Sequence, residues 1–257
     1  MRAVRAFYRL IALSLWTGLI YVVWQAGLWV TQRSPRRHLH WRVFMFRTWS
    51  RGFARILRMR VTVRGPSPSA PYLLVTNHLS YVDIILLASH LGCTFISRHD
   101  VASWPIFGHL TTKMGTIYLD RNTRKDLVRV SQAMAAALAR GEGVVLFAEG
   151  TSTCGNRVQL LKPSLLEIAV QSRQPVHYAS LSYRTPAGEM PAHLAVCWWG
   201  EMAFSPHVLN LLKLKKFQAE IVFGTETLIE TDRKVLAHKL HERISAIFTP
   251  VVKSDGL

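Results

Sequence analysis

Acidic residues are absent from the first third of this 257-residue chain, in which the first one to appear is Asp83. Lysine is absent from the same stretch, yet thirteen arginines lie between Arg2 and Arg64. Most of the net charge of +17 is therefore concentrated at the N-terminus. A segment this basic suits an anionic surface, either lipid head groups or nucleic acid. Its many tryptophans favour lipid, because tryptophan prefers the membrane–water interface.

Cysteine is scarce, and the sequence patterns of several catalytic centres are missing. The three cysteines, Cys93, Cys154 and Cys197, form no C-x-x-C pair and have no spacing suited to zinc. No H-E-x-x-H or G-x-S-x-G motif occurs, which argues against a zinc protease and against the nucleophile elbow of a serine hydrolase. We therefore expect reduced thiols and no metal site.

One long apolar run lies near the N-terminus. No charged residue occurs from Ile11 to Thr31, and about 21 residues in a helix reach roughly 30 Å, enough to cross a bilayer core. The run is too long for a signal peptide, and no A-x-A-like cleavage site follows it, so we expect a membrane anchor. Arginines are denser after the run than before it, which predicts that the rest of the chain stays in the cytoplasm. The sequence leaves open whether the helix spans the bilayer or lies in one leaflet.

A second segment, Val43–Leu57, mixes aromatic and aliphatic residues with arginines that recur every three or four positions. This spacing places the arginines on one face of a helix. Such a helix is typical of an anionic membrane interface, although a helix that merely packs on the domain would show the same pattern. We therefore predict a membrane anchor with an interfacial basic helix over residues 1–60, and an α/β domain over residues 61–257.

Apolar strands alternate with helical stretches after a loop at residues 65–69. This alternation predicts an α/β fold with a mixed, largely parallel sheet flanked by helices, preceded by the N-terminal membrane-anchoring helical segment. The predicted strands are Tyr72–Thr76, Thr94–Ser97, Gly115–Leu119, Gly143–Ala148, Val176–Ser182, Ala192–Trp198 and Ala219–Gly224. The predicted helices are Val82–His90, Pro105–Thr112, Thr123–Arg140, Pro163–Gln171 and Asp232–Ile247.

A histidine and an aspartate follow the first of these strands. His78 comes just after Tyr72–Thr76, and Asp83 lies five residues further on. If a helix begins between them, the carboxylate can return to the imidazole, hold it in one tautomer and stabilise the imidazolium formed on proton uptake. The pair is a candidate general base. Taken alone, it is equally consistent with Asp83 capping a helix and His78 making a structural hydrogen bond.

Four segments in this order resemble the glycerolipid and lysophospholipid acyltransferase family. The first matches the pattern N-H-x₄-D in full, and the second matches G-x-[IV]-[FY]-[IVL]-D-R. The third matches F-P-E-G-T-R-S at four positions, and the fourth matches a proline before an apolar strand only loosely. The segments are Asn77–Asp83, Gly115–Arg121, Phe147–Ser152 and Pro175–Ala179. The resemblance covers about residues 60–225.

The resemblance implies a membrane-bound O-acyltransferase, which moves an acyl chain from acyl-coenzyme A or acyl carrier protein to the hydroxyl of a lyso-lipid. It implies that His78, held by Asp83, takes the hydroxyl proton, with no metal, no bound cofactor and no covalent acyl-enzyme. Backbone N–H groups of Gly150 and Thr151 are candidates for binding the oxyanion, and Glu149 would position the acceptor or order the turn. The implied substrate-binding residues are Asn77, Arg121, Glu149, Gly150, Thr151 and Arg157.

Two departures from the family pattern matter. Ala148 replaces a proline, which costs only turn rigidity. Ser152 stands where the family has an arginine thought to hold the acceptor's phosphate, and loss of a bidentate donor there is not conservative. Either another cation takes over or the acceptor has no glycerol phosphate. The candidate cations are Arg121, Arg157 and Lys162.

Several assignments follow from the resemblance. The leading acceptor is 1-acyl-sn-glycerol-3-phosphate, which gives phosphatidic acid in phospholipid biosynthesis. The alternative is a lyso-ornithine lipid, because Glu149–Arg157 and Trp199–Met202 are similar to a bacterial subgroup that includes both activities. The implied location is the bacterial inner membrane, with the catalytic domain on the cytoplasmic side.

Two alternatives lie outside this chemistry. A catalytically inactive scaffold would bind lipid only. A basic, membrane-tethered nucleic-acid-binding protein is the distant alternative. No nucleic-acid motif accompanies the charge, so we expect membrane lipids, a lyso-lipid and an acyl thioester as partners, and no nucleic acid.

Overall fold

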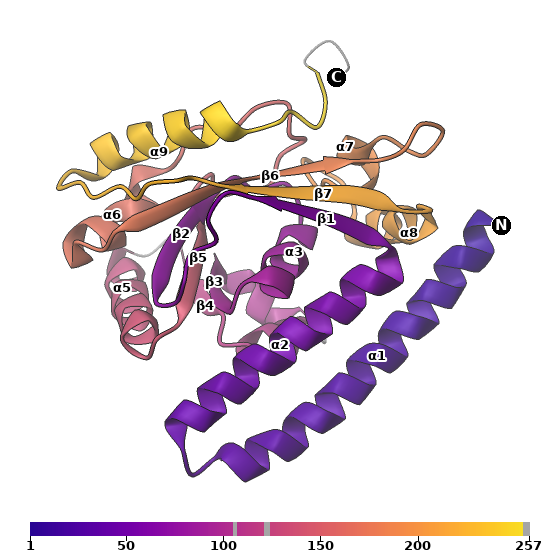
Figure 1. Ribbon diagram of the computed structural model, residues 1–257, viewed down its shortest axis with the longest axis horizontal. Coiled ribbons are helices and arrows are strands. Elements are labelled where there is room, and N and C mark those ends of the chain that lie inside the picture. Colours follow the sequence, from indigo (N-terminus) through magenta and orange to yellow (C-terminus); the bar gives the residue numbers. More distant parts are fainter. Residues whose placement is uncertain (105–106, 121–123, 254–257) are drawn as a thin grey trace.

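The computed structural model describes residues 1–104, 107–120 and 124–253. Within them a seven-stranded sheet has the order β1-β7-β6-β2-β5-β3-β4 (Figure 1). The strands are β1 (Met59–Arg64), β2 (Tyr72–Thr76), β3 (Cys93–Arg98), β4 (Ile117–Leu119), β5 (Gly143–Phe147), β6 (Val176–Arg184) and β7 (Phe217–Phe223). Neighbouring strands are parallel except β6 and β7, which are antiparallel. The predicted mixed, largely parallel sheet is confirmed.

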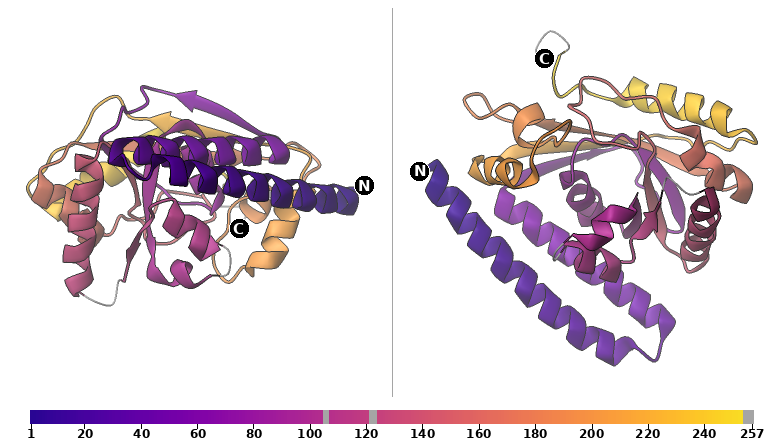
Figure 2. Two further views of the ribbon diagram at one scale, coloured as in Figure 1. Left: turned by 90° about the horizontal axis from the view of Figure 1, so that it is seen from below. Right: turned by 180° about the vertical axis from the view of Figure 1, so that it is seen from behind.

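Helices cover both faces of this sheet (Figure 2). Two apolar clusters, one on each face, form the core. One contains side chains from α1 (Arg2–Thr31), α2 (Pro35–Leu57), α3 (Val82–His90), α7 (Ala192–Ala195) and α8 (Phe204–Lys213). The other contains side chains from α5 (Arg124–Ala139), α6 (Pro163–Ser172) and α9 (Arg233–Ile247). A short 3-10 helix, η1 (His99–Ser103), and α4 (Phe107–Lys113) lie between β3 and β4 in the chain.

The central strand β2 fixes the position of the chemistry. All five of its residues are buried, as expected for a parallel strand covered on both faces. It pairs with β5 in a register that places Thr76 opposite Phe147. Because the two strands are parallel, the residues that follow them emerge at the same edge of the sheet. The His78 and Glu149 segments therefore meet there.

Helix α1 is longer than the predicted anchor, because it begins at Arg2 and not at Ile11. It forms an antiparallel hairpin with α2, as Figure 1 shows, and its N-terminal half also packs on α8. Arg9 is buried and donates hydrogen bonds to the main-chain carbonyls of Leu57 and Leu212. By length and composition α1 is able to cross a membrane. Its outward face carries exposed apolar side chains, among them Phe7, Leu15, Leu19, Val22 and Trp29.

Helix α2 extends the predicted Val43–Leu57 segment by eight residues toward the N-terminus, from the capping residue Ser34. Two of its arginines do not face outward. Arg47 donates to the His90 carbonyl (2.6 Å), and Arg51 donates to the Ser89 carbonyl (2.9 Å). These carbonyls belong to the last turn of α3, and a helix C-terminus favours cations. The cationic face thus serves partly to pack α2 on the domain.

One predicted strand is wrong, and three elements were not predicted. The segment Ala192–Trp198 contains the short helix α7 (Ala192–Ala195), where the Pro191 carbonyl accepts the N–H groups of Leu194 and Ala195. Helix α8, the 3-10 helix η1 and strand β1 were not predicted. Strand β1 begins at Met59, two residues before the predicted domain boundary, and pairs with β7 at the sheet edge.

Candidate active site

Asn77 anchors the start of the N-H-x₄-D segment. Its side chain is buried and forms two hydrogen bonds with the main chain of Leu181 on β6, one from Nδ2 to the carbonyl (3.0 Å) and one to Oδ1 from the N–H (2.8 Å). Asn77 therefore fixes the end of β2 against β6. The predicted role of Asn77 in substrate binding stays a prediction, and its buried amide is held by the main chain of β6.

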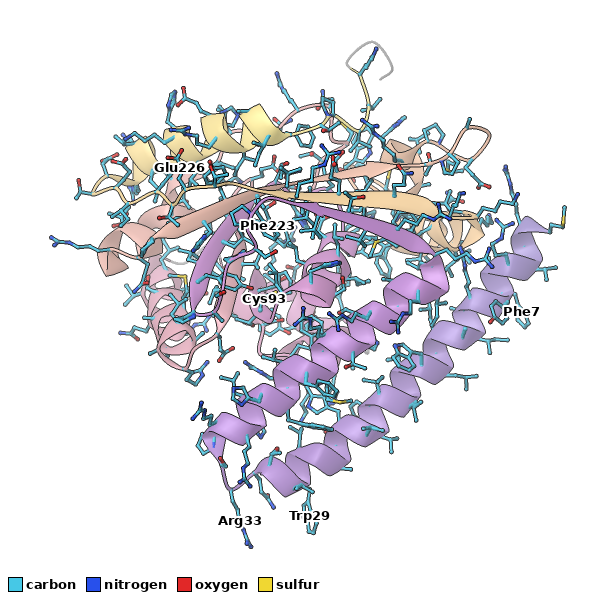
Figure 3. The ribbon with its side chains drawn as sticks, in the orientation of Figure 1. Phe7, Trp29, Arg33, Cys93, Phe223 and Glu226 are labelled. Carbon is cyan, nitrogen blue, oxygen red and sulfur yellow. The ribbon has the colours of Figure 1, made fainter. Side chains whose placement is uncertain are left out.

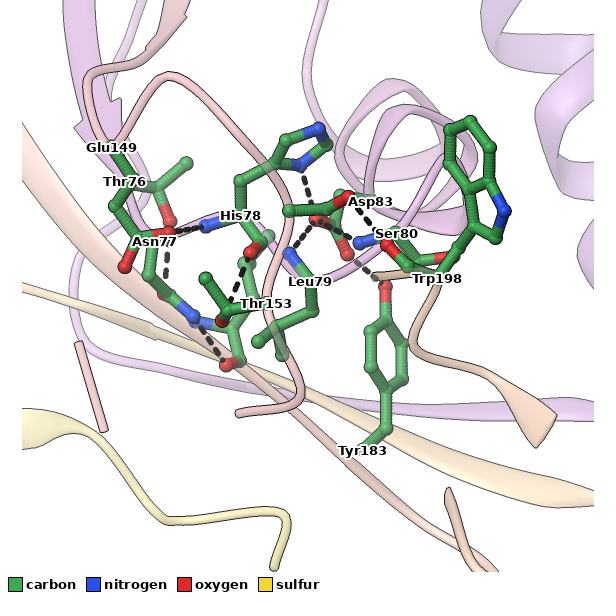
Figure 4. Close-up of polar contacts among 12 residues, drawn as sticks. Thr76, Asn77, His78, Leu79, Ser80, Asp83, Glu149, Thr153, Tyr183 and Trp198 are labelled. Carbon is green, nitrogen blue, oxygen red and sulfur yellow. Dashed lines mark hydrogen bonds and ion pairs between the residues drawn. The ribbon is translucent and has the colours of Figure 1, made fainter. Parts of the chain in front are cut away.

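The imidazole of His78 lies against the carboxylate of Asp83, as Figure 4 shows, with 2.8 Å between Nδ1 and Oδ2. Asp83 is in the first turn of α3 and is fully buried, whereas 21% of the His78 side chain is exposed. The ring also stacks on Phe147, with 4.1 Å between centroids. Because Nδ1 is occupied by the carboxylate, Nε2 is the nitrogen left to accept a proton from a substrate.

The Asp83 carboxylate is held by three further donors. Its Oδ2 accepts the N–H groups of Leu79 (2.7 Å) and Ser80 (3.0 Å), and its Oδ1 accepts the hydroxyl of Tyr183 (2.6 Å). A carboxylate with this many donors is locked in one orientation. Asp83 therefore has both of the roles considered for it from the sequence. It orders the turn before α3, and it also orients the imidazole of His78.

The side chain of Glu149 contacts the backbone of the segment between β2 and α3. Its Oε2 accepts the N–H of His78 (2.6 Å) and its Oε1 accepts the N–H of Gln159 (2.7 Å). Only 3% of the residue is exposed, and burial raises the pKa of its carboxyl to about 8, against the lowering effect of the two backbone donors. Glu149 therefore holds the His78 backbone to the loop after β5. Of the two roles predicted for it, the geometry favours ordering the turn.

Glu149→Gln is expected to destabilise the protein by about 1–3 kcal/mol, because the amide NH₂ would face one of two buried N–H donors and leave it unsatisfied. Acyl transfer should fall with it, since the His78 backbone loses its partner. Denaturant unfolding of the full chain measures the first effect. Glu167→Gln is the matched control: Glu167 forms an ion pair with Arg233 at the surface, and its loss should cost under about 1 kcal/mol. Equal costs for the two variants would count against this role.

The turn at Gly150 needs glycine, because its φ is +80°. A side chain there would also meet Lys162, whose aliphatic carbons and Nζ lie about 3.0–3.1 Å from the position of a Cβ. The Gly150 N–H donates to the Phe147 carbonyl (3.2 Å), so it closes the turn and is not free to bind an oxyanion. Thr151 is exposed at the same turn, and within the described residues its N–H has no hydrogen-bond acceptor. Of the two predicted donors, only Thr151 keeps an available N–H.

A cavity of about 240 Å³ opens beside His78 and the Gly150–Thr151 turn. Its lining is mixed. The apolar lining residues are Ile84, Phe95, Ile96, Val101, Trp104, Phe147, Trp198 and Trp199. The polar side chains are those of His78, Ser97, Arg98, Asp100, Thr151 and Ser152.

Arg157 and Lys162, the two predicted phosphate-binding cations among the described residues, do not line this cavity. Arg157 lines a different hollow with Gln159 and His241, and Lys162 lies against Gly150 as described above. Arg121 lies outside the described residues. Ser152 lines the cavity, and its hydroxyl donates to the Trp198 carbonyl.

The cavity instead carries Arg98 and Asp100, which sequence reasoning missed. They form an ion pair at its mouth, with 2.9 Å between Nη2 and Oδ2 and 3.0 Å between Nε and Oδ1. Arg98 ends β3, and β3 is parallel to β5. The position of Arg98 at a strand end was therefore the available signal, because parallel strands end at the same edge.

No group of three or more histidine, cysteine, aspartate or glutamate side chains suited to a metal ion occurs in the part of the chain that the structure describes. The three cysteines are free and buried.

Comparisons with known proteins agree with this architecture. Residues 58–182 match the family model described as Acyltransferase. The chain is 32% identical over 210 residues to a lyso-ornithine lipid O-acyltransferase from Brucella abortus, covering 76% of this chain and 78% of that one. It is 26% identical to a 1-acyl-sn-glycerol-3-phosphate acyltransferase from Neisseria meningitidis, covering 77% and 78% of the two chains. The crystal structure of the 1-acyl-sn-glycerophosphate acyltransferase PlsC from Thermotoga maritima has the same fold, with a TM-score of 0.65 and 17% identity over 95% of each chain.

Proposed function

The chain belongs to the acyltransferase family, and we propose that it transfers an acyl group from a thioester to the hydroxyl of a lyso-lipid, with His78 as the general base. The observation that carries this proposal is the position of His78. Its ring is bonded through Nδ1 to a buried carboxylate and lines the cavity beside the Gly150–Thr151 turn. A general base needs this combination of a fixed tautomer and access to substrate.

The acyl group passes directly from the thioester to the acceptor, without a covalent enzyme intermediate. The acceptor hydroxyl gives its proton to Nε2 of His78 as its oxygen attacks the thioester carbonyl. The Thr151 N–H donates to the oxyanion that develops. When the tetrahedral intermediate collapses, the C–S bond breaks and the imidazolium returns the proton to the thiolate. Asp83 stabilises the imidazolium between these two steps.

The acyl donor is an acyl thioester, either acyl-coenzyme A or acyl carrier protein. We propose that residues 1–60 hold the enzyme on the membrane and that residues 61–257 carry the chemistry. The exposed apolar face of α1 supports membrane association. The dense arginines from Arg33 onward support a catalytic domain on the cytoplasmic side of a bacterial inner membrane.

Two acceptors remain as proposals, and both have relatives of the corresponding activity. 1-Acyl-sn-glycerol-3-phosphate is the leading acceptor from the sequence. The cavity adds an observation in favour of the alternative, a lyso-ornithine lipid. Its mouth presents both charges, Arg98 and Asp100, and Ser152 replaces the arginine of the family pattern. A zwitterionic aminolipid matches such a pair, whereas a phosphate would be repelled by Asp100.

Purified full-length enzyme should be assayed with each lyso-lipid and with both acyl donors. Under the aminolipid proposal, kcat/KM is expected to be at least about tenfold higher with lyso-ornithine lipid, and Asp100→Asn is expected to narrow this ratio, because the ammonium loses a partner worth about 1 kcal/mol. Acyl transfer to lysophosphatidate alone would exclude the aminolipid as the acceptor. Absence of acyl transfer to lysophosphatidate would exclude the leading acceptor. Absence of acyl transfer to both lyso-lipids would contradict the proposed function itself.

A further inference from the structure

A second hollow, of about 880 Å³, lies at the N-terminal end of β2, whereas His78 follows the C-terminal end of that strand. It is lined by the first turns of α2, by the loop at 67–70 and by Tyr72, which begins β2. His78 follows the other end of that strand, and five strand residues span about 17 Å. The hollow, here called the hairpin hollow, is therefore separate from the proposed catalytic cavity.

The hairpin hollow is strongly basic. Three arginines line it, Arg36, Arg47 and Arg140, together with one carboxylate, that of Glu142. Glu142 is buried and is shared between Arg140 and Arg42, so it cannot neutralise the hollow. A cavity with a surplus of guanidinium groups attracts an anion, and phosphate oxygens match their geometry.

The arginines of the lining differ in how far they are already engaged. Arg47 donates through Nη2 to the His90 carbonyl, and its Nε is enclosed by protein atoms and closed to a ligand. Arg36 is exposed on the first turn of α2, and no ion pair or hydrogen bond involves its side chain in the described part of the structure.

The hollow adjoins the tip of the α1–α2 hairpin, where exposed apolar and basic side chains lie together. Figure 3 shows Trp29 and Arg33 projecting outward at this tip. Trp29 and Val30 are 76% and 73% exposed, and only four residues separate Val30 from Pro35 at the start of the hollow's lining. Exposed tryptophan beside clustered arginine is typical of the membrane–water interface.

We propose that the hairpin hollow binds the head group of an anionic phospholipid, whose phosphate lies among Arg36, Arg47 and Arg140 and whose acyl chains run along the α1–α2 tip. The site would fix the depth and orientation of the enzyme on the membrane. This proposal is independent of the acyl acceptor and of the chemistry at His78.

The test compares Arg36→Glu with Arg37→Glu in the full-length protein. Both variants change the charge equally and on adjacent residues, but Arg37 does not line the hollow. Binding is measured to vesicles of phosphatidylcholine alone and with phosphatidylglycerol. One arginine near an anionic membrane surface contributes about 1 kcal/mol wherever it lies, so both variants should lose this general attraction. We expect Arg36→Glu to weaken binding to the mixed vesicles by about tenfold or more beyond the loss of Arg37→Glu, because only Arg36 also loses the site. Neither variant should change binding to phosphatidylcholine alone.

Equal losses for the two variants would overturn the proposal, because general attraction to an anionic surface would then suffice. A loss on neutral vesicles would do the same, since it would indicate a damaged hairpin. Competition by millimolar inorganic phosphate at fixed ionic strength would show a site for free phosphate and not for lipid. Acyl transfer to a detergent-solubilised lyso-lipid, which does not need the vesicle, reports that the Arg36→Glu protein is folded.

Discussion

His78→Ala is expected to lower kcat/KM for acyl transfer by about 10²–10⁴-fold, the range that a well-placed general base contributes. The ring is partly exposed and makes its one charged contact with Asp83. Its loss should therefore leave the fold intact. The measurement is initial acyl transfer from a radiolabelled thioester to the lyso-lipid by purified full-length protein.

Three controls make the His78→Ala result interpretable. The variant should bind anionic vesicles as the wild type does and unfold at a similar denaturant concentration. Binding of the lyso-lipid should also persist, since the loss lies in the chemical step. Near-normal acyl transfer would show that the histidine has a structural role only. The inactive-scaffold alternative would be supported if the wild type itself transferred no acyl group to any lyso-lipid tested.

Asp83→Asn is expected to lower acyl transfer by about 10²-fold or more, because the neutral amide no longer stabilises the imidazolium. The amide has nearly the same shape and is able to accept the N–H groups of Leu79 and Ser80 on its oxygen. The amide NH₂ would then face Tyr183, whose hydroxyl would have to turn and accept. We therefore expect a stability cost of only about 1–3 kcal/mol. Activity and denaturant unfolding are measured on the same preparation.

Tyr183→Phe is the matched control for Asp83→Asn. Tyr183 is buried, and its hydroxyl donates to Oδ1 of Asp83 at 2.6 Å. Its removal costs one buried hydrogen bond, again about 1–3 kcal/mol, but leaves the carboxylate charged. Activity should remain within about tenfold of the wild type. If both variants lost activity equally, rigidity around the pair would matter and the charge would not.

The sequence was sufficient for the elements whose pattern is local. Strand β2 and helix α3 have the predicted bounds, Tyr72–Thr76 and Val82–His90. The segment Ala192–Trp198 misled the prediction, because an apolar run of seven residues fits a strand and a helical turn equally well. The Pro191 carbonyl accepts two N–H groups from this segment and stabilises the helical turn. The antiparallel pairing of β6 with β7 also depends on contacts between distant segments.

The candidate site divides in the same way. His78 and Asp83 were found because five positions and one helical turn bring them together. Arg98 and Asp100 were missed, because their place at the cavity depends on β3 lying beside β5. Arg157 was expected near His78, but the loop after the Gly150 turn carries it to another hollow. Spacing predicts contacts along one element, whereas contacts between loops require the order of the strands.

The central claim is that His78 takes the proton of the accepting hydroxyl. It is tested most directly with a lyso-lipid whose accepting hydroxyl is replaced by a thiol. Thiols are much stronger acids than alcohols (the cysteine thiol has an ordinary pKa of about 8.5) and attack as thiolates, so a thiol acceptor needs little help from a base. With the thiol acceptor, the deficit of His78→Ala relative to wild type should shrink to about tenfold or less. A deficit as large as that with the hydroxyl acceptor would contradict the account.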